Sequence, residues 1–136
     1  MSRLTLDCSM TMAWCFEDEG HPRADAVLAS LATQAAVVPS LWPLEVANVL
    51  AVCERRGRIN AADIARFLQW LERLPISIDV EGAERAFRDV LSLARNERLS
   101  AYDAAYLELA LREGGPLATL DAALAASAVK LGITVL

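Results

Sequence analysis

The sequence opens with Leu4-Thr5-Leu6-Asp7-Cys8-Ser9, a short apolar run that meets a carboxylate. The run predicts a buried strand over residues 4–7, and Ser9 is placed to cap a helix that ends at about residue 16. Similar short runs predict strands over residues 36–39, 76–78, 117–120 and 133–135. Helix-favouring Ala and Leu dominate the stretches between them. This alternation predicts an α/β fold in which helices flank a mostly parallel central sheet.

Capping and stop residues mark the expected helix boundaries. Ser40, Asn60 and Ser100 are placed to cap helices, and Gly57 and Gly114 are placed to end two of them. The remaining helices are expected over residues 23–33, 82–95 and 122–131. No linker or repeat interrupts the pattern, so residues 1–136 are predicted to form a single domain.

Composition argues against several classes of protein. With 55% hydrophobic residues the chain can bury a core, yet no apolar run approaches the roughly 20 residues of a membrane-spanning helix. Cys8, Cys15 and Cys53 form no close pair, and we interpret them as small hydrophobes in a reducing compartment. We therefore expect a cytoplasmic protein. The net charge of −5 argues against binding of nucleic acid through a broadly basic surface.

Four acidic residues stand where apolar segments meet loops or helix starts. Asp7 ends the first strand, Glu45 lies in the first turns of the helix after the second strand, and Asp121 follows a late strand. Sites in open α/β sheets lie at the carboxyl ends of strands, so these three belong at one edge. Asp103, in the first turn of the helix capped by Ser100, joins them if that helix starts at the same edge.

A cluster of carboxylates is costly because like charges repel and each group loses water. Divalent cations offset this cost, and carboxylates favour hard ions such as Mg²⁺ or Mn²⁺. Such ions activate a bound water and stabilise the charge on a phosphodiester. The predicted metal-binding and catalytic residues are Asp7, Glu45, Asp103 and Asp121. The only histidine, His21, lies in a polar turn, which gives little support to a histidine-dependent mechanism.

Each acid also has a purely structural interpretation. Asp7 and Asp121 could be N-caps. Asp103 could complete a capping box with Ser100, and Glu45 could be a solvated helix residue. For any one residue the structural interpretation is the better one. Four such acids at these junctions, embedded in apolar sequence, favour a functional site.

Over essentially its whole length the chain resembles the PIN-domain ribonucleases, and specifically the VapC-type toxins of bacterial toxin–antitoxin pairs, and four segments carry the resemblance. Leu6-Asp7-Cys8-Ser9 is similar to the opening strand-end motif, and the segment from Pro39 to Asn48 is similar to the one that carries the second acid. Leu99-Ser100-Ala101-Tyr102-Asp103-Ala104-Ala105-Tyr106 is the most specific match, at the third acid. Leu117-Ala118-Thr119-Leu120-Asp121 resembles the fourth.

The resemblance implies a three-layer PIN-like fold and Mg²⁺- or Mn²⁺-dependent cleavage of an RNA substrate by an endoribonuclease. It also implies a homodimer, and neutralisation by the cognate antitoxin of a type II toxin–antitoxin pair. The four acids would bind the metal, and Ser9, Asn48 and Thr119 would be supporting polar groups. Trp42 and Trp70 are candidates for a partner surface, because tryptophan is enriched at binding hot spots. Four basic residues are candidate phosphate contacts but are better interpreted as solvated charges: Arg3, Arg95, Arg98 and Lys130.

Three other functions compete with this interpretation. A receiver-like signalling module would need paired acids near the first strand and a lysine at the end of a late strand, and neither is present. A phosphatase with an aspartate nucleophile would need a DxD-type start, whereas residue 9 is Ser. A protein-binding module that kept the fold and lost the chemistry agrees poorly with four intact acids.

Overall fold

The architecture is that of a computed structural model, which describes residues 2–16 and 20–136. This part of the chain forms a sheet of four strands in the order β3-β2-β1-β4, and every neighbouring pair is parallel. The strands are β1 (Leu4–Leu6), β2 (Ala36–Val38), β3 (Ile76–Ile78) and β4 (Leu117–Ala118). Both β1 and β2 are buried along their whole length, as expected of parallel strands covered on both faces.

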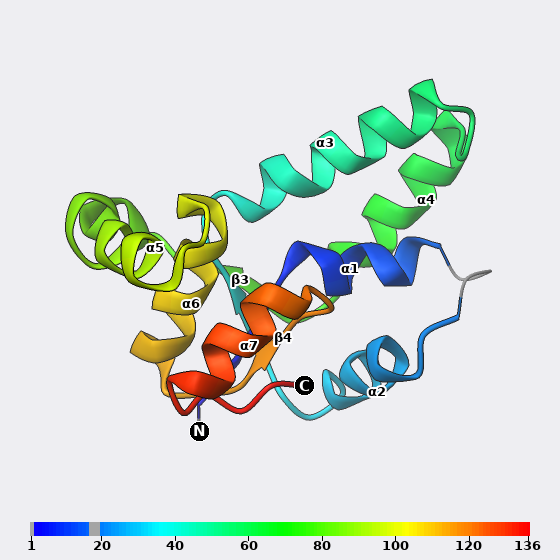
Figure 1. The fold of residues 1–136 in the computed structure, drawn as a ribbon. Helices are drawn as coiled ribbons and strands as arrows, with labels where there is room; N and C mark the ends of the chain where they lie inside the picture. Colours follow the sequence, from blue (N-terminus) through cyan, green and yellow to red (C-terminus); the bar gives the residue numbers. More distant parts are fainter. Residues whose placement is uncertain (1, 17–19) are drawn as a thin grey trace.

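Helical segments connect the strands, because parallel neighbours need crossover connections. Their bounds are α1 (Cys8–Cys15), α2 (Pro22–Ser30), α3 (Trp42–Arg55), α4 (Ala61–Leu71), η2 (Gly82–Arg85), η3 (Ala86–Val90), α5 (Leu91–Glu97), α6 (Ala101–Glu113) and α7 (Ala122–Lys130). Helix α6 packs against β1 and β4, and α5 and α7 pack on α6, whereas α1 packs on α2 and α3. In Figure 1, α3 and α4 form a long pair above the sheet, away from α7. The predicted three-layer α/β fold is confirmed.

The core lies between the sheet and its helices. Its largest fully buried side chains include Leu4 and Leu6 from β1, Met10 from α1, and Tyr106 and Leu107 from α6. All three cysteines are free thiols. Within the described residues, no helix has both the length and the apolar character needed to cross a membrane.

The structure corrects two of the predicted caps. Helix α1 begins at Cys8, so Asp7 occupies the N-cap position and Ser9 lies inside the helix. Helix α3 begins at Trp42 with Leu41, not Ser40, at its N-cap. With Ser40 as the N-cap, Pro43 would be the third helical residue and would lack the N–H from which a capping hydroxyl accepts.

The other two caps are as predicted. Asn60 and Asp63 form a reciprocal capping box at the start of α4, with hydrogen bonds of 2.9 and 3.0 Å. The Ser100 hydroxyl accepts a hydrogen bond of 3.1 Å from the backbone N–H of Asp103. Both helices therefore start where their sequences place them.

The single helix predicted over residues 82–95 is wrong. The segment comprises a 3₁₀ turn (η2), a π-helical turn (η3) and the short α5. In a regular α-helix Phe87 and Val90 would share a face, since residues three apart are neighbours. The wider π turn separates them, so that Val90 is 6% exposed and Phe87 is 91% exposed.

The last predicted strand, residues 133–135, is reduced to one parallel bridge between Val135 and Leu117. Backbone hydrogen bonds of 2.9 Å join Leu117 N–H to the Thr134 carbonyl and Leu136 N–H to the Leu117 carbonyl. Because β4 has only two residues, this segment has little strand with which to pair.

Candidate active site

Asp7 is the most buried of the four predicted acids, with 5% of its surface exposed. Its backbone N–H donates to the Ala118 carbonyl at 3.0 Å, which ties the end of β1 to β4. Its Oδ2 accepts two hydrogen bonds, one of 2.6 Å from the Thr119 hydroxyl and one of 2.7 Å from the Ser9 hydroxyl. A carboxylate that has lost most of its water is therefore held by two donors from different segments.

The same two hydroxyls also fix the chain after β4. Thr119 Oγ1 accepts from the backbone N–H of Asp121 at 3.0 Å, and Ser9 Oγ accepts from that of Leu120 at 2.9 Å. Asp121 then caps α7, because its Oδ1 accepts from the Leu124 N–H at 2.9 Å. One network therefore positions Asp7 and Asp121 together.

Glu45 lies in the first turn of α3 and is held from across the sheet. Its Oε1 accepts a hydrogen bond of 2.5 Å from the hydroxyl of Tyr106, a fully buried residue of α6. Tyr106 is a site residue that no motif or spacing in the sequence indicates. A buried tyrosine hydroxyl usually has a hydrogen-bond partner, and that was the one signal that could have found it.

Asp103 lies in the first turn of α6, and the structure brings it to the same edge as the other acids. The carboxylate charges of Asp7 and Asp121 both act on it. Within the described residues its own carboxylate has no hydrogen-bond donor, because only its backbone N–H is engaged by Ser100. Helix α6 therefore starts at the edge of the sheet where the other acids lie, which is the condition on which the predicted place of Asp103 depended.

Burial and mutual repulsion make these carboxylates harder to ionise. Burial raises the pKa of Asp7, of Glu45 and of Asp103. The neighbouring carboxylate charges raise each of these pKa values further, whereas the hydroxyls of Thr119 and Tyr106 oppose the rise at Asp7 and Glu45. Among the described residues, no basic side chain contributes to the pKa of Asp7, Glu45 or Asp103. The site therefore concentrates negative charge.

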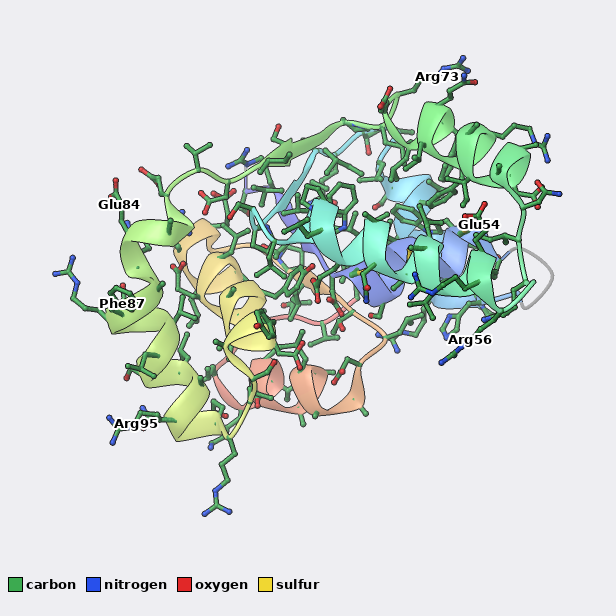
Figure 2. The ribbon with its side chains drawn as sticks, turned by 90° about the horizontal axis from the view of Figure 1, so that it is seen from above. Glu54, Arg56, Arg73, Glu84, Phe87 and Arg95 are labelled. Atoms are coloured by element: carbon green, nitrogen blue, oxygen red, sulfur yellow. The ribbon has the colours of Figure 1, made fainter. Side chains whose placement is uncertain are left out.

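Two of the three predicted supporting residues contact an acid. Ser9 and Thr119 both donate to Asp7, as described above. Asn48 lies one turn after Glu45 on α3, with an exposed side chain. Glu45 and Asn48 both belong to the long helix α3, whose ribbon is drawn in Figure 2.

The donor set suits a hard divalent cation, because oxygen ligands with repelling charges are what Mg²⁺ or Mn²⁺ neutralises. Among the residues that the structure describes, however, no three acidic, histidine or cysteine side chains converge on a single point. Asp103 and Glu45 are only partly buried, and Asp103 is unrestrained by hydrogen bonds, so side-chain rotation can close the cluster around an ion. The residues fit a metal in kind, and their side chains would adjust on binding.

The comparisons with known proteins identify the family. Residues 4–136 match the PIN domain family. The chain belongs to that family. This confirms the family predicted from the sequence.

Known proteins resemble this chain in sequence and in fold. The chain is 30% identical over 123 residues to ribonuclease VapC3 of Pyrobaculum aerophilum, covering 90% of this chain and 92% of that protein. The crystal structure of PAE2754 from Pyrobaculum aerophilum superposes with a TM-score of 0.68 at 24% identity, covering 93% of this chain and 79% of that one. A toxin–antitoxin complex from Klebsiella pneumoniae gives a TM-score of 0.57 at 18% identity, with coverage of 88% and 87%.

In this PIN domain, several residues have roles other than those considered from the sequence. Trp42 is buried, and its Nε1 donates to the Thr11 hydroxyl at 3.0 Å, so it belongs to the core and not to a partner surface. Arg3 pairs with Glu113 at 2.8 Å, and Lys130 pairs with Glu97 at 3.3 Å. Arg95 and Arg98 are exposed.

A further residue, which was not predicted from the sequence, supports the site from α2. The guanidinium of Arg23 donates to the backbone carbonyls of Thr119, at 2.8 Å, and Leu136, at 2.5 Å. Because the Thr119 side chain holds Asp7, Arg23 helps to fix the strand end from which two of the acids are positioned.

Proposed function

We propose that this PIN domain is a Mg²⁺- or Mn²⁺-dependent endoribonuclease that acts as the toxin of a type II toxin–antitoxin pair. The observation that carries the proposal is the placement of four acids, from four separate segments, so that each is within electrostatic reach of at least two of the others. Like charges in a partly buried site are unfavourable unless the site binds cations. Similarity to a ribonuclease of the VapC type supports RNA as the substrate.

The acids and the hydroxyl groups of the site have different roles in the proposed reaction. Asp7, Glu45, Asp103 and Asp121 would hold the metal, which would supply an activated water and stabilise the charge of the phosphodiester. Ser9 and Thr119 keep Asp7 in place, and Tyr106 keeps one oxygen of Glu45 directed toward α6. These hydrogen bonds orient the metal-binding oxygens before substrate arrives.

The partners follow from the same proposal. A cognate antitoxin would neutralise the toxin, in keeping with the structural likeness to a chain of a toxin–antitoxin complex. We also propose a homodimer and a site of action in the cytoplasm, where RNA substrates are available. A protein-binding module of the same fold would need none of the four carboxylates, and a receiver-like module would also need a lysine at the end of a late strand, which is absent from the sequence.

Purified protein tests the proposal directly. We expect RNA cleavage with Mg²⁺ or Mn²⁺, none with a chelator, and none from Asp7→Asn or Asp103→Asn, while far-UV circular dichroism shows that both variants remain folded. Asp89→Asn, at an exposed acid of η3, is the matched control and should cleave normally. Expression without a partner should arrest bacterial growth, except for the two site variants. Equal cleavage by wild type and both site variants would rule the mechanism out.

A further inference from the structure

An open cavity of about 500 Å³ lies at the C-terminal end of α1, facing the turn between α3 and α4. Its lining combines four aromatic side chains with two arginines: Trp14, Phe16, Phe67, Trp70, Arg58 and Arg66. None of these residues belongs to the acid site, and none has a role in the proposed cleavage reaction.

The aromatic side chains form a fixed wall. The rings of Trp14 and Trp70 meet edge to face, with centroids 6.0 Å apart and planes at 86°. The Phe67 and Trp70 centroids are 5.8 Å apart. Trp14 is anchored by a hydrogen bond of 2.8 Å from its Nε1 to the Ala24 carbonyl. Phe16 and Trp70 are only half-buried, so each retains open surface for a ligand.

The arginines reach the same wall from the α3–α4 turn. The Arg58 guanidinium lies over the Phe16 ring, 4.2 Å from its centroid. Arg66, one turn of α4 beyond Asp63, is exposed and pairs with it. An exposed ion pair of this kind is weak, so Arg66 can exchange Asp63 for another anion.

Charge sets this end of the molecule apart. Residues 55–70 carry four arginines and one acid, although the whole chain has a net charge of −5. In Figure 2 the side chain of Arg56 extends from the end of α3, whereas Arg73 lies at the opposite end of the α3–α4 pair. Arginine side chains gathered at one end of a protein can contact a polyanion.

A continuous helix face joins this cavity to the acids. Ser9, Ala13 and Phe16 follow one another along one side of α1, at spacings of four and three residues. All three line a second cavity of about 280 Å³, together with Leu120. Ser9 and Leu120 border Asp7 and Asp121, and Phe16 lines both cavities. The seven-residue span is about 10 Å long, the length of roughly three stacked nucleotides.

We infer that single-stranded RNA runs from the acid site along the Ser9–Ala13–Phe16 face of α1 to the α3–α4 turn. There Arg58 and Arg66 contact phosphates, and Phe16 and Trp70 stack on a base. Aromatic stacking combined with arginine contacts is the usual way in which proteins hold single strands without reading sequence. The inference rests on the proposed function. Residues 17–19, which are acidic, lie outside the described residues.

Binding and cleavage test the inference separately. Binding of a labelled 12-nucleotide single-stranded RNA is measured by fluorescence anisotropy in the Asp7→Asn background, in which the RNA stays intact. Adding Arg58→Gln and Arg66→Gln should weaken binding about tenfold. Loss of two phosphate contacts should also reduce the slope of log K against log salt by about 1.4. The matched control is Arg73→Gln with Arg88→Gln, two exposed arginines that line neither cavity, and it should change neither quantity.

Cleavage of short and long RNA gives the second measurement. The wild type should cleave a 12-nucleotide RNA with a higher kcat/KM than a 3-nucleotide RNA, and the Arg58/Arg66 variant should lose that advantage while its cleavage of the short RNA is unchanged. Equal affinity and salt slope for the Arg58/Arg66 and Arg73/Arg88 variants would overturn the inference and leave the cavity to a protein partner. A wild type that binds RNA through this surface but never cleaves it would overturn the proposed function alone.

Discussion

Tyr106 and Glu45 are 61 positions apart in the chain, yet the tyrosine hydroxyl donates a hydrogen bond of 2.5 Å to Oε1 of the glutamate. Tyr106 is fully buried in α6, whereas Glu45 lies half-buried at the start of α3. The bond lowers the pKa of Glu45 against the opposing effects of burial and of its acidic neighbours. It therefore links the ionisation of a site residue to the packing of two helices.

Removing the hydroxyl should move the pH dependence of cleavage. In Tyr106→Phe the pKa of Glu45 rises further, so the acid limb of the pH–rate profile should shift to higher pH. Metal affinity should fall about tenfold, the usual effect of losing a group that orients a metal ligand. Tyr102→Phe is the matched control, because Tyr102 lies on the same helix and is 66% exposed. Superimposable profiles for the two variants would show that the bond has no role at the site.

The hydroxyl of Thr119 should contribute to both stability and activity. Thr119→Val preserves shape but deprives Asp7 Oδ2 of its 2.6 Å donor and the Asp121 N–H of its acceptor. Leaving such buried groups unpaired should cost about 1–3 kcal/mol in the free energy of unfolding, and cleavage should fall with it. Urea denaturation measures the first effect. The control is Thr33→Val, at an exposed position, and an equal effect there would contradict the assignment.

Asp103→Asn should stabilise the protein while abolishing cleavage. Burial and like charges raise the pKa of Asp103 in the folded state. A raised pKa favours folding when the group is protonated, and this contribution disappears as the pH rises through the folded-state pKa. At pH 7, without divalent ions, the variant should therefore melt about 2 °C above the wild type.

Two further measurements separate this effect from an ordinary surface change. The difference in melting temperature should shrink as the pH falls through the raised pKa of Asp103, because the wild-type carboxyl then becomes protonated as well. Added Mg²⁺ should raise the melting temperature of the wild type more than that of the variant, since a ligand stabilises only the form that binds it. A variant less stable than wild type across the whole pH range would contradict the electrostatic account.

Two adjacent glycines should differ in their tolerance of alanine. A Cβ on Gly115 would lie 2.2 Å from the backbone carbonyl oxygen of Arg3, so Gly115→Ala must displace the start of β1 and should cost about 3 kcal/mol. Gly114 has φ of +68° and open space around it, so Gly114→Ala should cost only about 1 kcal/mol. Equal losses in thermal denaturation would mean that the close approach to Arg3 is relieved without cost.

Site residues whose positions are set by the neighbouring sequence could be predicted, and those whose positions depend on packing between distant segments could not. Asp7 and Asp121 could be placed at one edge because each lies just beyond the end of an apolar strand segment, and parallel strands share their carboxyl edge. Asp103 could not, since its position depends on the packing of α6 across β1 and β4. The bond between Tyr106 and Glu45 joins two helices and leaves no trace in the spacing of either one.

The errors in the fold have the same origin. Asp7 and Ser9 both favour an N-cap position, so local preference could not choose between them. In the structure the Ser9 hydroxyl is occupied by Asp7 and by the Leu120 N–H, contacts that exist only after β4 has paired with β1. The π turn at η3 likewise depends on tertiary packing, which buries Val90 and leaves Phe87 exposed.

Asp7 is at once a hydrogen-bonding member of the sheet and the innermost carboxylate of the cluster. A molecule whose central strands have separated has therefore also dispersed its acids, so heat should inactivate the protein and melt it along one curve. In a cell this leaves two populations, intact molecules and unfolded chains open to proteolysis, and no partly melted form that still carries the site.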